Sequence, residues 1–280
     1  MSQPAADLPG HAPIAAFPMY DYPELTAVHD ALWAALHEAL SSAGVAELPA
    51  RLTRDSSHFD LRRHPRLLLG QACEYPLATS CAGYVRLVAT PRYAVPGCDG
   101  STLYRSAVVV RAADPAETLA DLRGRRCIVN ERDSNSGMNL LRAAIAPTSG
   151  GARFFSSVTL SGSHRASVAA VAAGLADVAA VDGVSFAHFQ KLDPPVVASL
   201  RVLCWTPPSR CPPCVTAAGT SDSTLEALRG ALAKVSVDPR LAHVRERLFL
   251  EGFDLEPDDR FIEVLSHERR AAELGYSALL

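Results

Sequence analysis

The stretch LRGRRCIVNERDSNSGMNLLRAAIA, Leu122–Ala146, contains a strand pattern, a polar loop and a helix pattern in that order. The apolar run Cys127–Asn130 predicts a buried strand, and Gly137–Ala146 has the apolar spacing of a helix. The loop Glu131–Ser136 connects them. In an open parallel sheet, ligands bind beyond the carboxyl ends of the strands, where helix N-termini present free N–H groups. This loop is therefore the first candidate for a binding site.

Strand and helix patterns alternate along the rest of the chain. Downstream, Phe154–Leu160 predicts a strand, followed by Ser161–His164 and a helix rich in alanine and valine. Upstream, Tyr84–Thr90 and Ser106–Arg111 are β-rich runs, and we expect them to be long paired strands. The alternation predicts an α/β protein with two mostly parallel sheets flanked by helices.

The length of 280 residues suits two lobes of ordinary size. We expect the first lobe to consist of residues 1–107 and 206–280, completed by the C-terminal helices, and the second of the inserted residues 108–205. The inserted lobe contains the main candidate anion-binding loops. The strands Tyr104–Val110 and Val202–Thr206 would then be the two hinge strands that join the lobes.

Composition and charge exclude several classes of protein. With 48% hydrophobic and 20% charged residues, the chain has the material for a packed core. A net charge of −3 gives no broad field to attract nucleic acid, so an anion would have to be bound locally. No apolar run approaches the roughly 18 to 20 residues of a membrane span, and we expect no membrane insertion. The expected form is a monomer without a cofactor or a metal.

No secretory signal is visible in the sequence as written, which predicts a cytoplasmic location; a start further upstream would make the location periplasmic. The seven scattered cysteines fit reduced thiols better than a disulfide framework. Cys211-Pro-Pro-Cys214 could be a redox pair or half of a zinc site. No second pair of zinc ligands follows it, and the adjacent prolines favour a rigid hinge.

The serine loop, defined here as Asp133–Gly137, offers an anion two hydroxyls and an amide from Ser134, Asn135 and Ser136. Gly137 lets the backbone approach a ligand closely. These residues could form an oxyanion cradle. The alternative is that a serine only caps the following helix, which serines do routinely.

Ser163 and His164 repeat this arrangement after the next strand, with an imidazole that can donate an N–H to an anion. The alternative is again a capping serine beside a surface histidine. Asp182 follows the buried strand Val178–Val181, where a carboxylate would repel an anion. It suits a ligand that retains a proton, because the carboxylate accepts that hydrogen bond. The alternative is a helix N-cap.

Three more residues could reach a ligand from the first lobe: Tyr20, Gln71 and Tyr75. Tyr20 follows the first predicted strand, and the other two follow the second. For each of them, packing in the core is the alternative role.

Several of these segments, taken in order, resemble one known family, the phosphate/phosphite/phosphonate-binding subunits of ABC importers. The matching segments are Gly70–Leu77, Tyr104–Ser106, Leu122–Asn130, Asp133–Asn139, Gly162–Ser167 and Ala176–Asp182. The resemblance covers most of the chain and implies the two-lobed type 2 periplasmic-binding-protein fold. It also implies a small anionic ligand and, for a transport role, an ABC permease as partner.

The resemblance further implies roles for individual residues. In that family, one lobe holds the phosphonate oxygens with a serine-rich helix start and a histidine, an acidic residue accepts the ligand's proton, and tyrosines approach from the other lobe. The residues in matching positions are Ser134, Asn135 and Ser136 for the cradle, His164 as a second donor, Asp182 as acceptor, and Tyr20 and Tyr75 as the opposing wall.

The sequence therefore predicts a solute-binding protein for a small phosphorus oxyanion that closes by hinge motion, without catalytic residues. One alternative is a cytosolic enzyme on the same fold, acting as a small-molecule lyase or on a pyrimidine precursor. G-x-S-x-G, H-E-x-x-H and P-loop motifs are absent from the sequence, which argues against an enzyme. The other alternative is a ligand-sensing regulatory module.

Overall fold

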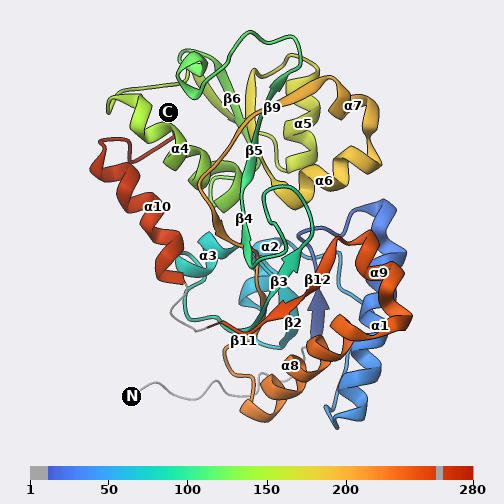
Figure 1. Ribbon diagram of the computed structural model, residues 1–280. Coiled ribbons are helices and arrows are strands. Elements are labelled where there is room, and N and C mark those ends of the chain that lie inside the picture. The colour runs from blue at the N-terminus through green and yellow to red at the C-terminus, as the bar shows by residue number, and fades with distance from the viewer. Residues whose placement is uncertain (1–11, 257–260, 280) are drawn as a thin grey trace. The chain divides into compact units, whose positions relative to one another are not determined.

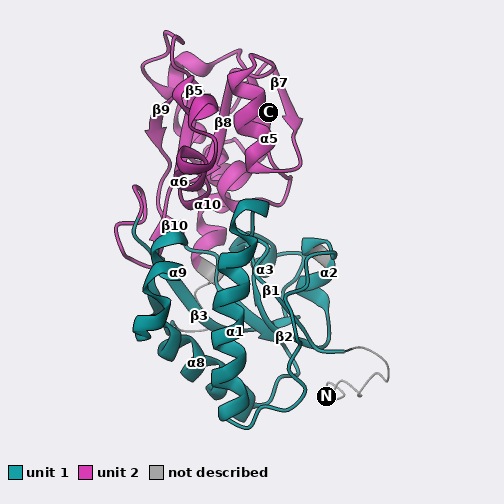
Figure 2. Cartoon of the chain, turned by 90° about the vertical axis from the view of Figure 1, so that its right-hand side faces the viewer, with its two compact units in different colours: residues 1–94, 211–259 teal, residues 95–210, 260–280 magenta. Residues whose placement is uncertain are grey.

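The computed structural model describes residues 12–256 and 261–279, and contacts divide the chain into two compact units (Figure 2). Unit 1 consists of residues 1–94 and 211–259, and unit 2 of residues 95–210 and 260–280. Each unit contains a five-stranded sheet flanked by helices (Figure 1). The predicted α/β class with two sheets is confirmed.

The sheet of unit 1 has the strand order β1-β2-β11-β3-β12. Its strands are β1 (Ile14–Ala16), β2 (Leu67–Gln71), β3 (Val85–Tyr93), β11 (Cys214–Ala217) and β12 (Leu250–Asp254). The helices are η1 (Pro23–Leu25), α1 (Thr26–Ser42), α2 (His58–Arg63), α3 (Glu74–Ala78), α8 (Asp222–Val237), η4 (Pro239–Leu241) and α9 (Ala242–Arg247). In α1, Leu32, Leu36 and Leu40 recur every four residues and are buried, so this helix presents one apolar face to the core.

The sheet of unit 2 has the order β7-β6-β8-β5-β9, beside a two-stranded sheet of β10 and β4. The strands are β4 (Leu103–Tyr104), β5 (Ser106–Arg111), β6 (Arg126–Val129), β7 (Ser157–Leu160), β8 (Val178–Asp182), β9 (Leu200–Trp205) and β10 (Ser209–Arg210). The helices are η2 (Leu119–Leu122), the π-helical turn η3 (Asn135–Asn139), α4 (Leu140–Ser149), α5 (His164–Ala172), α6 (Gly183–Leu192), α7 (Pro194–Ala198) and α10 (Phe261–Glu273). Every residue of β8 is buried, as expected for a central strand covered on both faces.

The sheets are mixed, and the prediction of mostly parallel sheets was wrong. Among the described residues, the parallel pairs are β1–β2, β6–β7 and β6–β8, while the remaining pairs are antiparallel. The predicted pairing of Tyr84–Thr90 with Ser106–Arg111 was also wrong, because β3 and β5 lie in different sheets. β3 pairs with β11 and β12, which come from much later in the chain, so local sequence could not reveal these partners.

The limits of the two units differ from the predicted lobes. The chain passes between units at 94/95, 210/211 and 259/260, whereas both predicted hinge strands lie inside unit 2. Residues 260–280, expected in the first lobe, belong to unit 2. Two side chains explain this assignment: Asn139 donates a hydrogen bond to the carbonyl of Val264, and Arg142 donates one to the carbonyl of Ser277.

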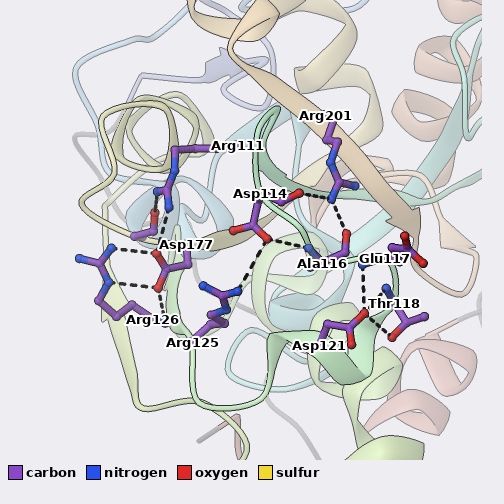
Figure 3. A network of polar contacts seen from close by, with 11 residues as sticks. Arg111, Asp114, Ala116, Glu117, Thr118, Asp121, Arg125, Arg126, Asp177 and Arg201 are labelled. Carbon is purple, nitrogen blue, oxygen red and sulfur yellow. Dashed lines mark hydrogen bonds and ion pairs between the residues drawn. The ribbon is translucent and has the colours of Figure 1, made fainter.

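A network of charged residues ties the strands of unit 2 together at the ends opposite the serine loop (Figure 3). The Arg126 guanidinium donates hydrogen bonds to both carboxylate oxygens of Asp177, at 3.1 and 2.8 Å. The main-chain N–H of Arg126 donates a third, of 2.9 Å, to one of these oxygens. Arg111 lies 3.5 Å from the same carboxylate. Together these contacts join the end of β5 to the starts of β6 and β8.

Candidate functional site

The serine loop enters its helix through a capping serine. Ser134 has extended backbone angles, and its Oγ accepts a hydrogen bond of 3.0 Å from the N–H of Gly137. The capping alternative therefore holds for Ser134. The next five residues form a π-helical turn, a wider turn that is frequent at functional sites.

Ser136 and His164 join the two candidate loops where each loop enters its helix. The Oγ of Ser136 lies 2.8 Å from Nε2 of His164, and 3.4 Å from the Oγ of Ser134. The other imidazole nitrogen, Nδ1, is enclosed and has no hydrogen-bond partner among the described residues. Burial lowers the pKa of His164 to about 4, so the imidazole is neutral at physiological pH. Two hydroxyls and a neutral imidazole thus gather at one point.

Gly137 is required by the close approach of Asn130, the residue that follows β6. A Cβ at position 137 would lie 1.8 Å from Oδ1 of Asn130. That oxygen is buried and has no hydrogen-bond partner among the described residues. Asn130 is a polar residue that the sequence analysis did not select. Its place at the end of a buried strand, three residues before the serine loop, was the signal that could have identified it.

The side-chain amide of Asn135 forms hydrogen bonds with residues of unit 2. Its Nδ2 donates to the hydroxyl of Tyr104 at 3.0 Å and to that of Ser209 at 2.9 Å. Its Oδ1 accepts a hydrogen bond of 2.8 Å from Asn139. The fully buried side chain therefore anchors the loop to β4 and β10. Its predicted ligand role stays a prediction, and its observed contacts are structural.

Ser163 caps α5 by accepting a hydrogen bond of 3.1 Å from the N–H of Ala166, and the residue is exposed. Asp182 is buried at the end of β8 and caps α6, because its Oδ1 accepts a hydrogen bond of 2.8 Å from Ser185 N–H. β8 packs against the π-helical turn of the serine loop.

Ser106 pairs with Asp182 across β5 and β8, and the buried Oγ of Ser106 has no hydrogen-bond partner among the described residues. Only the strand register could have identified Ser106.

Tyr20 and Gln71, both in unit 1, meet around Tyr93. The rings of Tyr20 and Tyr93 pack edge to face with centroids 5.4 Å apart, and Gln71 Nε2 donates to the Tyr93 hydroxyl at 2.9 Å. Tyr20, Gln71 and Tyr93 line a cavity of about 20 Å³, enough for one water molecule. Tyr75 does not line this cavity and lies in α3, largely buried. The packing alternative therefore accounts for the observed surroundings of Tyr20.

The CxxC segment provides no observed metal site. Cys211 and Cys214 are buried and reduced, and burial raises the pKa of the Cys214 thiol to about 12, which opposes the thiolate form that redox chemistry needs. The carbonyls of Pro212 and Pro213 accept hydrogen bonds from Gln71 and Ala72. Within residues 12–256 and 261–279, His, Cys, Asp and Glu nowhere gather in a group that could hold a metal ion.

Comparison with known proteins identifies the family to which these features correspond. Residues 67–260, more than half of the chain, match the family model described as "ABC transporter, phosphonate, periplasmic substrate-binding protein". Comparison with curated proteins found no match.

Solved structures show the same fold at low sequence identity. A binding-protein component of an ABC phosphonate transporter from Pseudomonas aeruginosa has a TM-score of 0.74 and 16% identity, over 94% of this chain and 88% of that one. PhnD1 from Prochlorococcus marinus, in complex with methylphosphonate, has a TM-score of 0.73 and 15% identity, over 94% and 99% of the two chains. A Xanthomonas citri protein bound to ATP has a TM-score of 0.70 and 17% identity, also over 94% and 99%.

Proposed function

The chain belongs to the family of periplasmic substrate-binding proteins of phosphonate ABC transporters, and from this membership we propose that it binds a small phosphorus oxyanion. The candidate ligands are phosphonate, phosphite and phosphate. The family consists of transport components rather than enzymes, so the alternative of a cytosolic enzyme is set aside. In the part of the chain that the structure describes, the helices are too short or too polar to cross a bilayer.

The observation that carries the proposal is the meeting of Ser136 with His164. Their polar atoms lie 2.8 Å apart, at the first turns of two helices in unit 2. The first N–H groups of a helix lack partners within that helix and favour an anion. A neutral imidazole adds a donor without a full buried charge. These features support a site in which phosphorus-bound oxygens accept hydrogen bonds from Ser134, Ser136 and His164.

Asp182 supports a ligand that carries a proton. The carboxylate is buried and caps α6, and the four lone-pair sites of a carboxylate allow it to accept further hydrogen bonds. A protonated oxygen of the ligand can donate a hydrogen bond to this carboxylate. The carboxylate would repel a fully deprotonated oxygen, and an esterified oxygen would have no proton to donate. The expected preference is therefore for a monoprotonated oxyanion.

Binding is expected to close the protein by a hinge motion between the two units, and an ABC permease is the expected protein partner. Closure would lower the radius of gyration measured by small-angle X-ray scattering when ligand is added. An unchanged radius of gyration at saturating ligand would contradict closure but would leave the binding proposal standing.

The test of binding is isothermal titration calorimetry with methylphosphonate, phosphite, phosphate, sulfate and acetate. We expect saturable binding of at least one phosphorus oxyanion, and none of acetate. Ser136→Ala and His164→Ala should each weaken that binding by at least tenfold, since each removes a donor to a charged group, a loss of roughly 1.5–3 kcal/mol. The matched control is His243→Ala, an exposed residue of α9. Failure of every phosphorus oxyanion to bind would refute the proposal.

A further inference from the structure

A second cavity, of about 430 Å³, lies within unit 2 and is open to solvent on one side. Its walls come from the end of β6, from the edge strand β7, from the start of α4 and from the segment 277–279. The volume falls in the range of small-molecule sites, roughly 300–1,000 Å³. None of the residues predicted for the oxyanion site lines it. We call it the edge cavity.

The floor of the edge cavity is apolar. Val129 and Leu160 are partners in the parallel β6–β7 register, so their side chains share one face of the sheet. Leu160 is 50% exposed, so half of its side chain is open to an occupant of the cavity. Val158, Met138 and Leu279 complete the floor. Burying these side chains under a hydrocarbon group would be favourable.

Three arginines line the edge cavity: Arg132, Arg142 and Arg153. Arg132 is exposed and makes no hydrogen bond or ion pair with the described residues. Among the residues that the structure describes, the partners of Arg153 are two main-chain carbonyls, those of Phe155 and Ser156. Arg142 is 4% exposed, and Glu268 lies 3.6 Å from it. The Nε of Arg142 is buried with no hydrogen-bond partner among the described residues.

We propose that the edge cavity binds a small organic anion with an apolar body, such as a carboxylate or a phosphate monoester that carries a hydrocarbon group. The guanidinium groups of Arg132 and Arg153 hold the anionic head, because the planar fork of arginine matches both carboxylate and phosphate. The hydrocarbon lies against Val158 and Leu160. An inorganic anion would leave this apolar floor exposed, and a neutral alcohol would leave the two arginines unpaired.

The test is calorimetric titration of the protein with octyl phosphate, octanoate, 1-octanol and inorganic phosphate, each well below its micellar concentration. We expect one equivalent of octyl phosphate or octanoate to bind to the edge cavity, and the comparison of the two identifies the preferred head group. The double variant Arg132→Ala, Arg153→Ala should weaken this binding at least tenfold. Leu160→Ser should weaken it as well and so separate the apolar contribution from the charge.

The controls separate this site from the oxyanion site. Arg247→Ala, an exposed arginine in unit 1, and His164→Ala should bind octyl phosphate as the unaltered protein does. The altered residues Arg132, Arg153 and Leu160 are exposed, so circular dichroism should show unchanged folding. Equal binding by the double variant, or loss of binding in His164→Ala alone, would overturn the proposal. Failure of methylphosphonate, phosphite and phosphate to bind would refute the oxyanion site and leave this one unaffected.

Discussion

Nε2 of His164 lies 2.8 Å from Oγ of Ser136, and this single contact joins the first turn of α5 to the π-helical turn that precedes α4. The two loops are 28 residues apart in sequence. They meet because β6 and β7 are parallel neighbours whose carboxyl ends lie at one edge of the sheet.

His164 should make the stability of the protein depend on pH. Burial lowers its pKa to about 4 from the ordinary value of 6.5, so the folded state binds fewer protons than the unfolded state between these values. The free energy of unfolding should therefore fall as pH decreases from about 6.5 to 4. His164→Gln should reduce that fall in urea titrations at several pH values. His243→Gln is the control, and a fall of the same size in His164→Gln would contradict the prediction.

Asp182→Asn should separate the capping role of this residue from a role in ligand selection. Asparagine caps helices as well as aspartate does, so the variant should keep its thermal stability within about 1 kcal/mol. It cannot offer a carboxylate to a protonated ligand. We expect at least tenfold weaker phosphonate binding and loss of the preference for the monoprotonated form in titrations between pH 5 and 9. Unchanged affinity at every pH would exclude Asp182 from the site.

Gly137→Ala should destabilise the protein by about 1–3 kcal/mol, the usual cost of overpacking, because the added Cβ would lie 1.8 Å from Oδ1 of Asn130. Asn130→Ala in the same chain should recover part of the loss. Gly230→Ala is the matched control, since it lies in α8 with no atom within 4 Å of the added Cβ. That change should stabilise the protein by about 0.5–1 kcal/mol. Equal effects of the two alanines on urea midpoints would refute the prediction.

Asp177→Asn should weaken unit 2 through the network of Figure 3. Hydrogen bonds from Arg126 hold the pKa of Asp177 at about 2, below its ordinary value of 3.8. The stabilisation is present above about pH 4 and is lost as pH falls toward 2. At pH 7 we expect only a small loss in the free energy of unfolding, because the Arg126 side chain is 47% exposed and solvent screens the pair. Asp55→Asn, in an exposed part of unit 1, should change nothing measurable.

Much of the fold was predictable because its elements are encoded locally. The predicted strand Ser106–Arg111 matches β5 at both ends, and the predicted buried strand Val178–Val181 lies within β8. Strand partners were not predictable. β3 pairs with β11 and β12, which lie more than a hundred residues later in the chain. β12 itself was missed, because Leu250–Asp254 is short and holds a glycine and two acidic residues.

The candidate site was predictable as far as it depends on strand ends. Ser136 and His164 were identified because each follows a strand by a few residues, and they are in contact. The function of the Asn135 amide was not predictable. Its partners Tyr104 and Ser209 lie in β4 and β10, whose pairing is visible only in the folded chain. Tyr93 was missed for a similar reason. The sequence around this strand tyrosine does not show that Gln71, from another strand, donates a hydrogen bond to its hydroxyl.

The assignment of residues 260–280 to unit 2 has a consequence for how the protein is made. Ala271, Tyr276 and Leu279 belong to the same buried cluster as Val108 and Val178. On a ribosome, the strands of this unit emerge well before residues 260–280, so the apolar core of unit 2 cannot be completed until that segment has been synthesised. A stop codon before this segment would release a protein whose unit 2 core stays exposed, a substrate for chaperones and proteases.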